Sequence, residues 1–120
     1  MEAVMDAKTQ ARYEARARIL KALAHPSRLC LVDRLSKGEC SVAQLTEEVG
    51  ADMSTVSKHL SLLRSAGLVF DEKRGNQVFY RLAAPCVLDF FSCLESVLHS
   101  QVQTQIDLVG DMKRAKLKIG

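Results

Sequence analysis

The sequence contains no tryptophan, and aromatic residues make up only 5% of its 120 positions. Leu, Val and Ala must therefore build most of the hydrophobic core, a composition that favours helices over a β-sandwich. No run of apolar residues approaches the ~20 that a membrane span needs, and the first residues lack the apolar region of a signal peptide. We therefore expect a cytoplasmic protein that does not associate with a membrane.

Several motifs of metal and enzyme sites are also missing. No two of the four cysteines form a C-x-x-C pair, which argues against a zinc ribbon or a thioredoxin-type site. No nucleophile elbow with a catalytic triad and no glycine-rich phosphate loop occurs. We expect no enzymatic activity and no obligatory cofactor. In the reducing cytosol each cysteine is either a small buried hydrophobe or a reactive thiolate.

The length of 120 residues suits one compact domain, residues 1–120, and is too short for two. The formal net charge of +3 does not by itself indicate nucleic-acid binding. The distribution of the charged residues along the chain is more informative. Between residues 53 and 69 stand two cations, Lys58 and Arg64, and no acid, and residues 113–118 hold four cations and no acid. Local gathering of positive charge is what a phosphate-binding face needs.

Proline and glycine divide the first half of the chain into helices. Residues 5–24 predict a helix that ends before Pro26, and Pro26 can begin the next one, which runs to about residue 36. Ser41 has the position of an N-cap for a helix over 42–49 that Gly50 closes, and Ser54 the position of an N-cap for a helix over 55–66. Two helices joined by a short turn, residues 42–66, are the signature of a helix-turn-helix.

After Gly67 the apolar period changes from 3.6 to 2, which predicts a β-hairpin over residues 68–82 with a basic tip at residues 73–76. A long helix follows over about 86–109, and residues 110–120 form a basic tail. The predicted fold is mainly α with a small β-hairpin, in the order α-α-α-α-β-β-α of a winged helix-turn-helix. We expect residues 42–82 to carry a DNA-binding unit.

A recognition helix must expose polar and basic side chains on the face that enters the major groove. Removing the inward positions Val56, Leu60 and Leu63 leaves a surface rich in hydroxyls, with two permanent cations and no carboxylate. An ordinary solvated helix could look the same, but the helix-turn-helix before it and the basic hairpin after it favour DNA. The predicted DNA-binding residues are Ser54, Thr55, Ser57, Lys58, His59, Ser61 and Arg64 in the helix, with Lys73, Arg74 and Asn76 in the hairpin.

Three runs of residues, 25–29 (His-Pro-Ser-Arg-Leu), 54–69 and 74–82, resemble in order and spacing the ArsR/SmtB family of metalloregulatory repressors. The resemblance spans roughly residues 15–100. It implies a homodimer, joined through the first and last helices (5–24 and 86–109), that sits on double-stranded operator DNA and leaves it when an inducer binds. His25, beside the proline that starts a helix, is expected to be structural rather than a ligand.

The family's metal sites are not repeated here. Arsenite-sensing members often carry Cys-Val-Cys in the helix before the recognition helix, where this chain has Cys40-Ser41-Val42. Zinc-sensing members carry Asp-x-His and a later His on the last helix, where this chain has Asp89-Phe90-Phe91 and a single His99. Zinc or nickel sensing of that type is therefore not expected.

Cys86 and Cys93 remain on the last helix, seven residues apart on one face. A rise of ~1.5 Å per residue separates their Cα atoms by about 10 Å, beyond the ~7 Å limit of a disulfide. The pair therefore needs a third group, such as Cys30, less favourably Cys40, or a thiol of the other subunit, or an unwound first turn. Soft thiolates favour trivalent arsenic or another thiophilic metal(loid) as the inducer.

Three alternatives stay open at this point. An oxidant or reactive sulfur species could act on the same cysteines. The cysteines could instead be an inert apolar stripe of a dimer, which would leave a DNA-binding module without an inducer. The winged helix could also serve only protein–protein contact.

Overall fold

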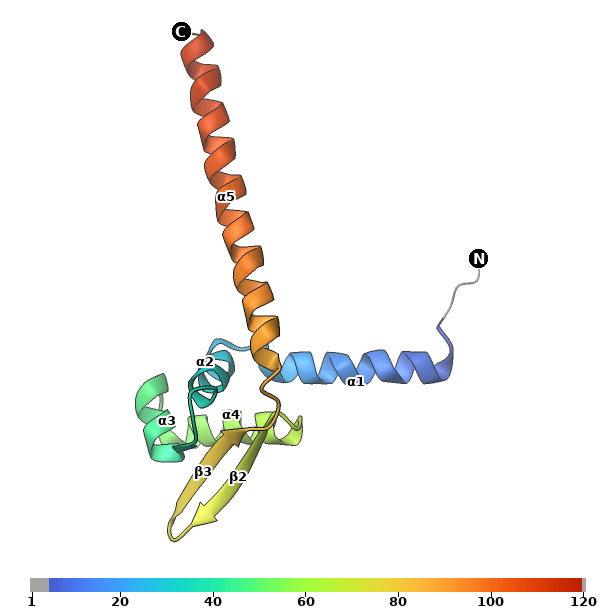
Figure 1. Ribbon diagram of the computed structural model, residues 1–120, viewed down its shortest axis with the longest axis vertical. Helices are drawn as coiled ribbons and strands as arrows, with labels where there is room; N and C mark the ends of the chain where they lie inside the picture. Colours follow the sequence, from blue (N-terminus) through green and yellow to red (C-terminus); the bar gives the residue numbers. More distant parts are fainter. Residues whose placement is uncertain (1–4, 120) are drawn as a thin grey trace. The chain divides into compact units, whose positions relative to one another are not determined.

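The computed structural model describes the backbone of residues 5–119 and the side chains of residues 5–113. The chain divides into two compact units, residues 1–85 and residues 86–120. Each unit is considered by itself, and the single domain expected from the length stays a prediction. The first unit contains four helices and a three-stranded sheet within the described residues, in the order α1-α2-β1-α3-α4-β2-β3, and the second contains α5 (Figure 1).

The first two helices lie close to their predicted bounds. Helix α1 (Ala7–Leu23) is capped by Asp6, whose carboxylate accepts the Thr9 backbone N–H at 2.8 Å. Helix α2 (Pro26–Leu35) begins at the predicted proline. Its N-cap is His25, whose Nδ1 accepts the Ser27 backbone N–H at 3.1 Å, so His25 has the structural role expected of it.

Helices α3 (Val42–Val49) and α4 (Met53–Ser65) form the predicted helix-turn-helix. Ser41 is the N-cap of α3, and the Ser41 hydroxyl accepts the Gln44 backbone N–H while the Gln44 side chain accepts the Ser41 N–H, which satisfies two orphan donors. Gly50 ends α3 in the left-handed region with a φ of 74°. The local signals at both ends of α3 were therefore sufficient.

The predicted cap of α4 is wrong. The N-cap is Asp52, not Ser54, and the helix starts two residues earlier than expected. One carboxylate oxygen of Asp52 accepts the Thr55 backbone N–H at 2.9 Å and the Ser54 hydroxyl at 2.7 Å. A carboxylate has two acceptor oxygens and a negative charge that the helix N-terminus favours, so it displaces a hydroxyl two residues later as the cap.

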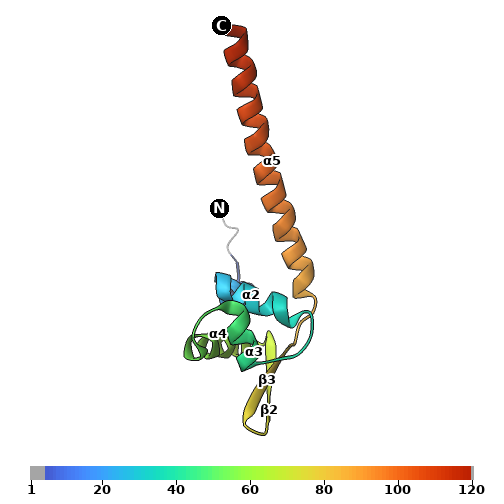
Figure 2. The ribbon, with the colours of Figure 1, turned by 90° about the vertical axis from the view of Figure 1, so that its left-hand side faces the viewer.

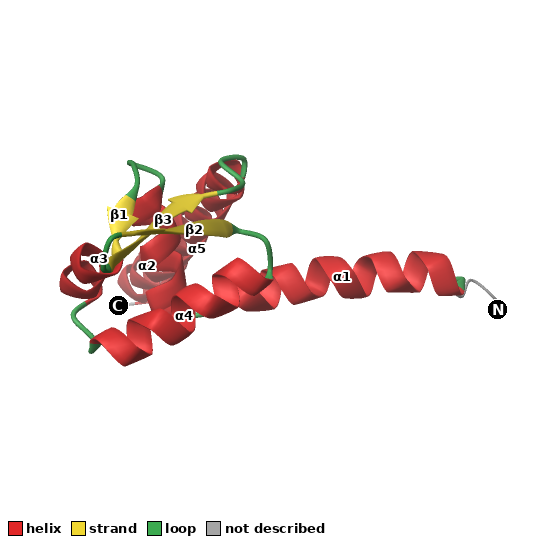
Figure 3. Cartoon of the chain, turned by 90° about the horizontal axis from the view of Figure 1, so that it is seen from below, coloured by secondary structure: helices red, strands yellow, loops and turns green. Residues whose placement is uncertain are grey.

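The sheet has one strand more than predicted. Strands β2 (Val69–Arg74) and β3 (Gln77–Leu82) form the expected hairpin, and a short strand β1 (Cys40–Ser41) pairs antiparallel with β3, giving the order β1-β3-β2 (Figure 3). A strand of two residues shows no alternation in a sequence, so periodicity could not find it. The turn of the hairpin is also tighter than expected, because Lys73 and Arg74 still belong to β2 and only Gly75 and Asn76 connect the strands.

The core of the first unit is formed by apolar side chains from helices α1 to α4 and from the β2–β3 hairpin. The inward residues of α4, Val56, Leu60 and Leu63, have no exposed surface. They share the core with the following side chains: Leu23, Leu31, Val32, Leu35, Leu45, Leu68, Val69 and Tyr80. Helix α2 buries Leu31, Val32 and Leu35, while Leu29 is only partly buried.

Helix α5 (Val87–Ile119) is much longer than the predicted 86–109. Gly110 lies inside it, so residues 110–119 continue the helix instead of forming a separate tail. A single glycine costs a helix only about 1 kcal/mol relative to alanine, and it does not by itself end one. Of the predicted basic side chains at the C-terminus, Arg114, Lys116 and Lys118 lie outside the described residues.

Within the described residues, no helix combines the length and apolarity that crossing a membrane would require.

The burial of Leu60 leads to a stability prediction. Leu60→Ala should lower the free energy of unfolding by about 2–5 kcal/mol, because it leaves a cavity in a core that cannot fully collapse. Leu62→Ala on the same helix is the matched control, since Leu62 is 51% exposed, and should change stability by less than about 0.5 kcal/mol. Urea denaturation followed by helical circular dichroism at one fixed protein concentration measures both, and equal destabilisation by the two variants would contradict the packing described.

Candidate nucleic-acid interface

The outward face of α4 is a strip of mostly polar side chains. Its side chains border a shallow hollow that runs along the helix and is lined by Ser57, Lys58, Ser61, Leu62 and Ser65. Three of these were predicted as DNA-binding residues. Leu62 and Ser65 were not, although their positions four residues after Lys58 and Ser61 put them on the same face. The strip holds three hydroxyls, one cation and no acid, a set that can bond phosphates and base edges.

The N-terminal end of α4 is held by Asp52. The Thr55 hydroxyl donates to the second oxygen of the Asp52 carboxylate at 3.0 Å, beside the bonds that this carboxylate receives from Ser54 and the Thr55 backbone. The hydrogen bonds from Ser54 and Thr55 lower the pKa of Asp52 from 3.8 to about 2. The predicted DNA contacts Ser54 and Thr55 therefore also serve to hold the cap, and at neutral pH a carboxylate stands next to them.

A second hollow lies between α4 and the hairpin. The first turn of α3, the start of α4 and the hairpin turn meet around it, and its lining residues are Ser41, Val42, Ala43, Met53, Ser57, Asn76, Gln77 and Val78. Figure 2 shows the hairpin on the same side of the unit as α3 and α4. Ser57 and Asn76 therefore line the same hollow. Both were predicted as DNA-binding residues, one from the helix and the other from the hairpin turn.

The cations predicted to contact DNA differ in how they are held. Arg64 forms an ion pair with Asp71 of β2, with 2.7 Å between Nη1 and Oδ2. Arg74 forms ion pairs with Glu39 and Glu72. For Lys58 and Lys73, no ion pair or hydrogen bond of the side chain occurs within the described part of the chain. Lys58 and Lys73 are consequently the cations whose charge is available to a phosphate.

His59 does not lie on the outward strip. Its ring is half-buried and sits 4.4 Å from the ring of His25, and its Nδ1 lies 3.2 Å from Nη1 of Arg28. Arg28 is itself tied to the end of α1 through a 2.6 Å hydrogen bond from Nε to the Ala22 carbonyl oxygen. Burial, together with the nearby His25 and Arg28, lowers the pKa of His59 below its ordinary value of 6.5. His59 thus links α4 to the junction of α1 and α2.

The four cysteines have different surroundings. Cys40 is fully buried in β1, and its thiol donates to the Gly38 carbonyl oxygen at 3.7 Å. Cys30, Cys86 and Cys93 are exposed. Cys86 precedes the first residue of α5, and its carbonyl oxygen accepts the Asp89 N–H at 3.1 Å. In the described residues of this single chain, no three His, Cys, Asp or Glu side chains come close enough to hold a metal.

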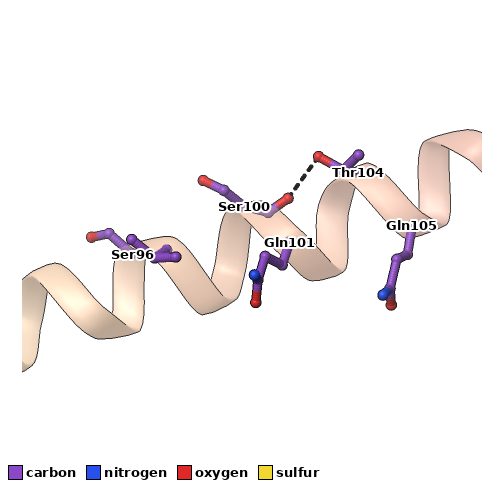
Figure 4. Close-up of a pocket in the computed structure, with 6 residues that line it drawn as sticks. Ser96, Ser100, Gln101, Thr104 and Gln105 are labelled. Carbon is purple, nitrogen blue, oxygen red and sulfur yellow. Dashed lines mark hydrogen bonds between the residues drawn. The ribbon is translucent and has the colours of Figure 1, made fainter.

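Helix α5 exposes many apolar side chains with a polar patch among them. Large apolar side chains are exposed along its length: Phe90, Leu94, Val97, Leu98, Val102, Ile106, Leu108, Val109 and Met112. A polar patch interrupts them, lined by Ser96, Ser100, Gln101, Thr104 and Gln105 (Figure 4), where the Thr104 hydroxyl donates to the Ser100 carbonyl oxygen at 2.9 Å. An apolar face of this length along a single helix is typical of a surface that another chain covers.

The sequence matches a known protein family over residues 25–70, the segment from the α2 cap to β2, and that family is described as "Bacterial regulatory protein, arsR family". An uncharacterized HTH-type transcriptional regulator of Mycobacterium tuberculosis is 30% identical over 102 residues, which cover 84% of this chain and 90% of that protein. A biofilm growth-associated repressor of Xylella fastidiosa is 36% identical over 85 residues, which cover 71% of this chain and 75% of the repressor.

A solved structure shows the same fold. The homodimeric winged helix-turn-helix DNA-binding domain of a possible ArsR-family regulator from Mycobacterium bovis superposes with a TM-score of 0.71 at 30% identity, covering 85% of this chain and 94% of that one. The predicted winged helix-turn-helix is therefore confirmed. The relatives are DNA-binding transcriptional regulators and not enzymes.

The environment of His59 predicts a pH dependence of stability. Because its pKa is lowered by folding, the unfolded chain binds more protons than the folded one as the pH falls below 6.5. The contribution of His59 to stability is therefore complete above that pH and is lost as the pH falls through the lowered pKa. Thermal unfolding between pH 7.5 and 5 should show this decline, and His59→Gln should reduce it. His99→Gln, which alters an exposed histidine of α5, should leave the decline intact, and an equal effect of both variants would contradict the assignment.

Proposed function

The chain belongs to the arsR family of bacterial regulatory proteins, and from that premise we propose that it is a repressor that binds operator DNA as a homodimer and is released by a thiol-reactive inducer. The observation that carries the DNA-binding part is the outward strip of α4. It presents three hydroxyls and Lys58 without an acid, while the opposite face of the helix is buried.

The role of each DNA contact follows from its environment. The hydroxyls of Ser57 and Ser61 lie midway along α4, where a recognition helix meets base edges, and Leu62 offers an apolar contact to a thymine methyl group. Lys58 and Lys73 suit phosphates on either side of the groove, because neither charge is neutralised within the described residues. Asn76 at the hairpin turn adds a polar group beside the helix.

The homodimer is proposed to form through α1 and α5. Both helices expose large apolar side chains: Tyr13, Ile19 and Leu20 on α1, and the nine apolar residues from Phe90 to Met112 on α5. A second copy can cover these surfaces symmetrically. In such a dimer, two α4 helices about one DNA turn apart would match two half-sites of an operator.

The inducer is proposed to act on the exposed thiols of Cys86 and Cys93, with Cys30 as a candidate third ligand. Cys40 is the weakest candidate, because its thiol is fully buried. Trivalent arsenic, which takes three thiolates, is the inducer that such a ligand set favours. A shift of α5 on binding would change the spacing of the two recognition helices, and a few kcal/mol of differential affinity is enough to empty the operator.

Replacing Lys58 tests the DNA contact. Lys58→Ala should weaken binding to the promoter DNA upstream of the chain's own gene. It should also reduce the slope of log K against log salt by about one, because one phosphate is no longer neutralised by the ammonium group. Fluorescence anisotropy at several salt concentrations measures both quantities.

Lys37→Ala is the matched control, because it removes the same charge from an exposed loop away from α4. If both variants weakened binding equally, the loss would come from the lower net charge and not from a contact made by Lys58. If wild-type protein showed no preference for promoter DNA over unrelated duplex, the protein would be a module for protein–protein contact and not a repressor.

The inducer is tested by release of bound promoter DNA on addition of arsenite. Wild-type protein should be released, and Cys86→Ser and Cys93→Ser should each raise the arsenite concentration needed, because each removes one ligand. Cys30→Ser shows whether the third thiolate comes from α2. Polysulfide and hydrogen peroxide, added separately, distinguish a reactive-sulfur or redox sensor. Tight DNA binding that none of the three reagents relieves would mean a constitutive DNA-binding protein.

A further inference from the structure

Arg74, at the end of β2, donates hydrogen bonds to two carboxylates. Its Nη1 and Nη2 donate to the two oxygens of Glu39 at 2.7 and 2.8 Å, a two-pronged pair that joins residues 35 positions apart. Its Nη2 and Nε donate to one oxygen of Glu72 at 2.6 and 3.2 Å. The guanidinium also lies 4.7 Å from the centre of the Phe79 ring, which limits its rotation.

These hydrogen bonds leave Arg74 little capacity to bind a phosphate. A guanidinium has five N–H donors, and four hydrogen bonds to carboxylates already occupy its three nitrogens. The negative charges of Glu39 and Glu72 also offset the positive charge of Arg74, and Arg81 adds a further positive charge near Glu39. Although one exposed ion pair contributes little to stability, a two-pronged pair within a network of three charges is the geometry in which such pairs matter.

The position of Glu39 shows what the cluster connects. Glu39 directly precedes β1, and the second residue of β1, Ser41, is the N-cap of α3. The Arg74–Glu39 pair therefore ties the free end of the hairpin to the start of the helix-turn-helix. It extends the pairing of β1 with β3, whose register joins Cys40 to Tyr80 and Ser41 to Phe79, toward the tip of the wing.

We propose that Arg74 is a positioning residue for DNA binding: through Glu39 it fixes the wing relative to the helix-turn-helix, so that Lys73 and Asn76 meet the DNA backbone, and it does not bind phosphate itself. This inference rests on the proposed DNA-binding function. It replaces the direct phosphate contact expected for Arg74 from the sequence.

The two roles of Arg74 predict opposite effects of removing Glu39. If Arg74 bound phosphate, Glu39→Met would free the guanidinium and remove a repelling charge, so operator binding would tighten. If Arg74 positions the wing, Glu39→Met should weaken operator binding by about 2- to 5-fold, which corresponds to the upper part of the range for exposed ion pairs. Glu47→Met removes the same charge from the exposed surface of α3 and should bind at least as tightly as wild type.

A charge exchange separates positioning from general electrostatics. In a Glu72→Gln background, Arg74→Glu should weaken binding to the promoter duplex strongly. Adding Glu39→Arg rebuilds the pair in reverse and should restore binding to within about 3-fold of the background. Adding Glu47→Arg instead gives the same net charge without the pair and should not restore it. Equal rescue by both, or rescue by neither, would overturn the proposal.

Amide hydrogen exchange of the free protein tests the Arg74–Glu39 pair without DNA. Glu39→Met should speed exchange of the backbone amides of β2 and β3, and Glu47→Met should not. Unchanged exchange in Glu39→Met would overturn the positioning role even if DNA binding were altered. If wild-type protein failed to bind the promoter duplex, the proposed function would fall, while the exchange result would still decide whether Arg74 holds the wing.

Discussion

Val56, Leu60 and Leu63 pack with no exposed surface, and this packing fixes the rotation of α4 about its own axis. Because a helix repeats every 3.6 residues, burying one face dictates which side chains point outward. Ser57, Lys58, Ser61, Leu62 and Ser65 form the outward strip for this reason, and His59 turns toward His25 and Arg28. Which side chains of α4 face outward thus depends on the core rather than on the polarity of each residue.

Ion pairs then decide which positive charges remain available. Four of the predicted DNA-binding residues are permanent cations, and in the structure they divide into two pairs. Arg64 and Arg74 hold β2 to α4 and to the segment before β1, whereas Lys58 and Lys73 have no such partner within the described residues. This division suits the two chemistries, because the planar guanidinium binds carboxylates with two prongs and the ammonium group of lysine acts as a point charge.

In the second unit, exposed apolar surface, and not charge, is the main feature of the molecule's outside. Within the described residues, helix α5 exposes nine large apolar side chains, with a patch of hydroxyls and amides among them. Polar groups within an apolar helix face favour one register of pairing over others. Two of the exposed thiols, Cys86 and Cys93, lie at or just before the start of this helix, so a reagent that bound them would act where the proposed dimer helix begins.

Local residue signals were enough to predict the helices and the hairpin, because Pro26, Ser41, Gly50 and Gly67 act on neighbours within a few residues. Even there the predicted cap of α4 and the predicted end of α5 were wrong, because Asp52 caps α4 in place of Ser54 and Gly110 does not end α5. Which polar groups meet across the fold was settled by tertiary packing instead. Strand β1 exists because β3 lies beside it, and Arg74 finds Glu39 across 35 residues, as Arg28 finds His59 across 31. Contacts between residues so far apart depend on how buried faces pack, and no local pattern of residues encodes that geometry.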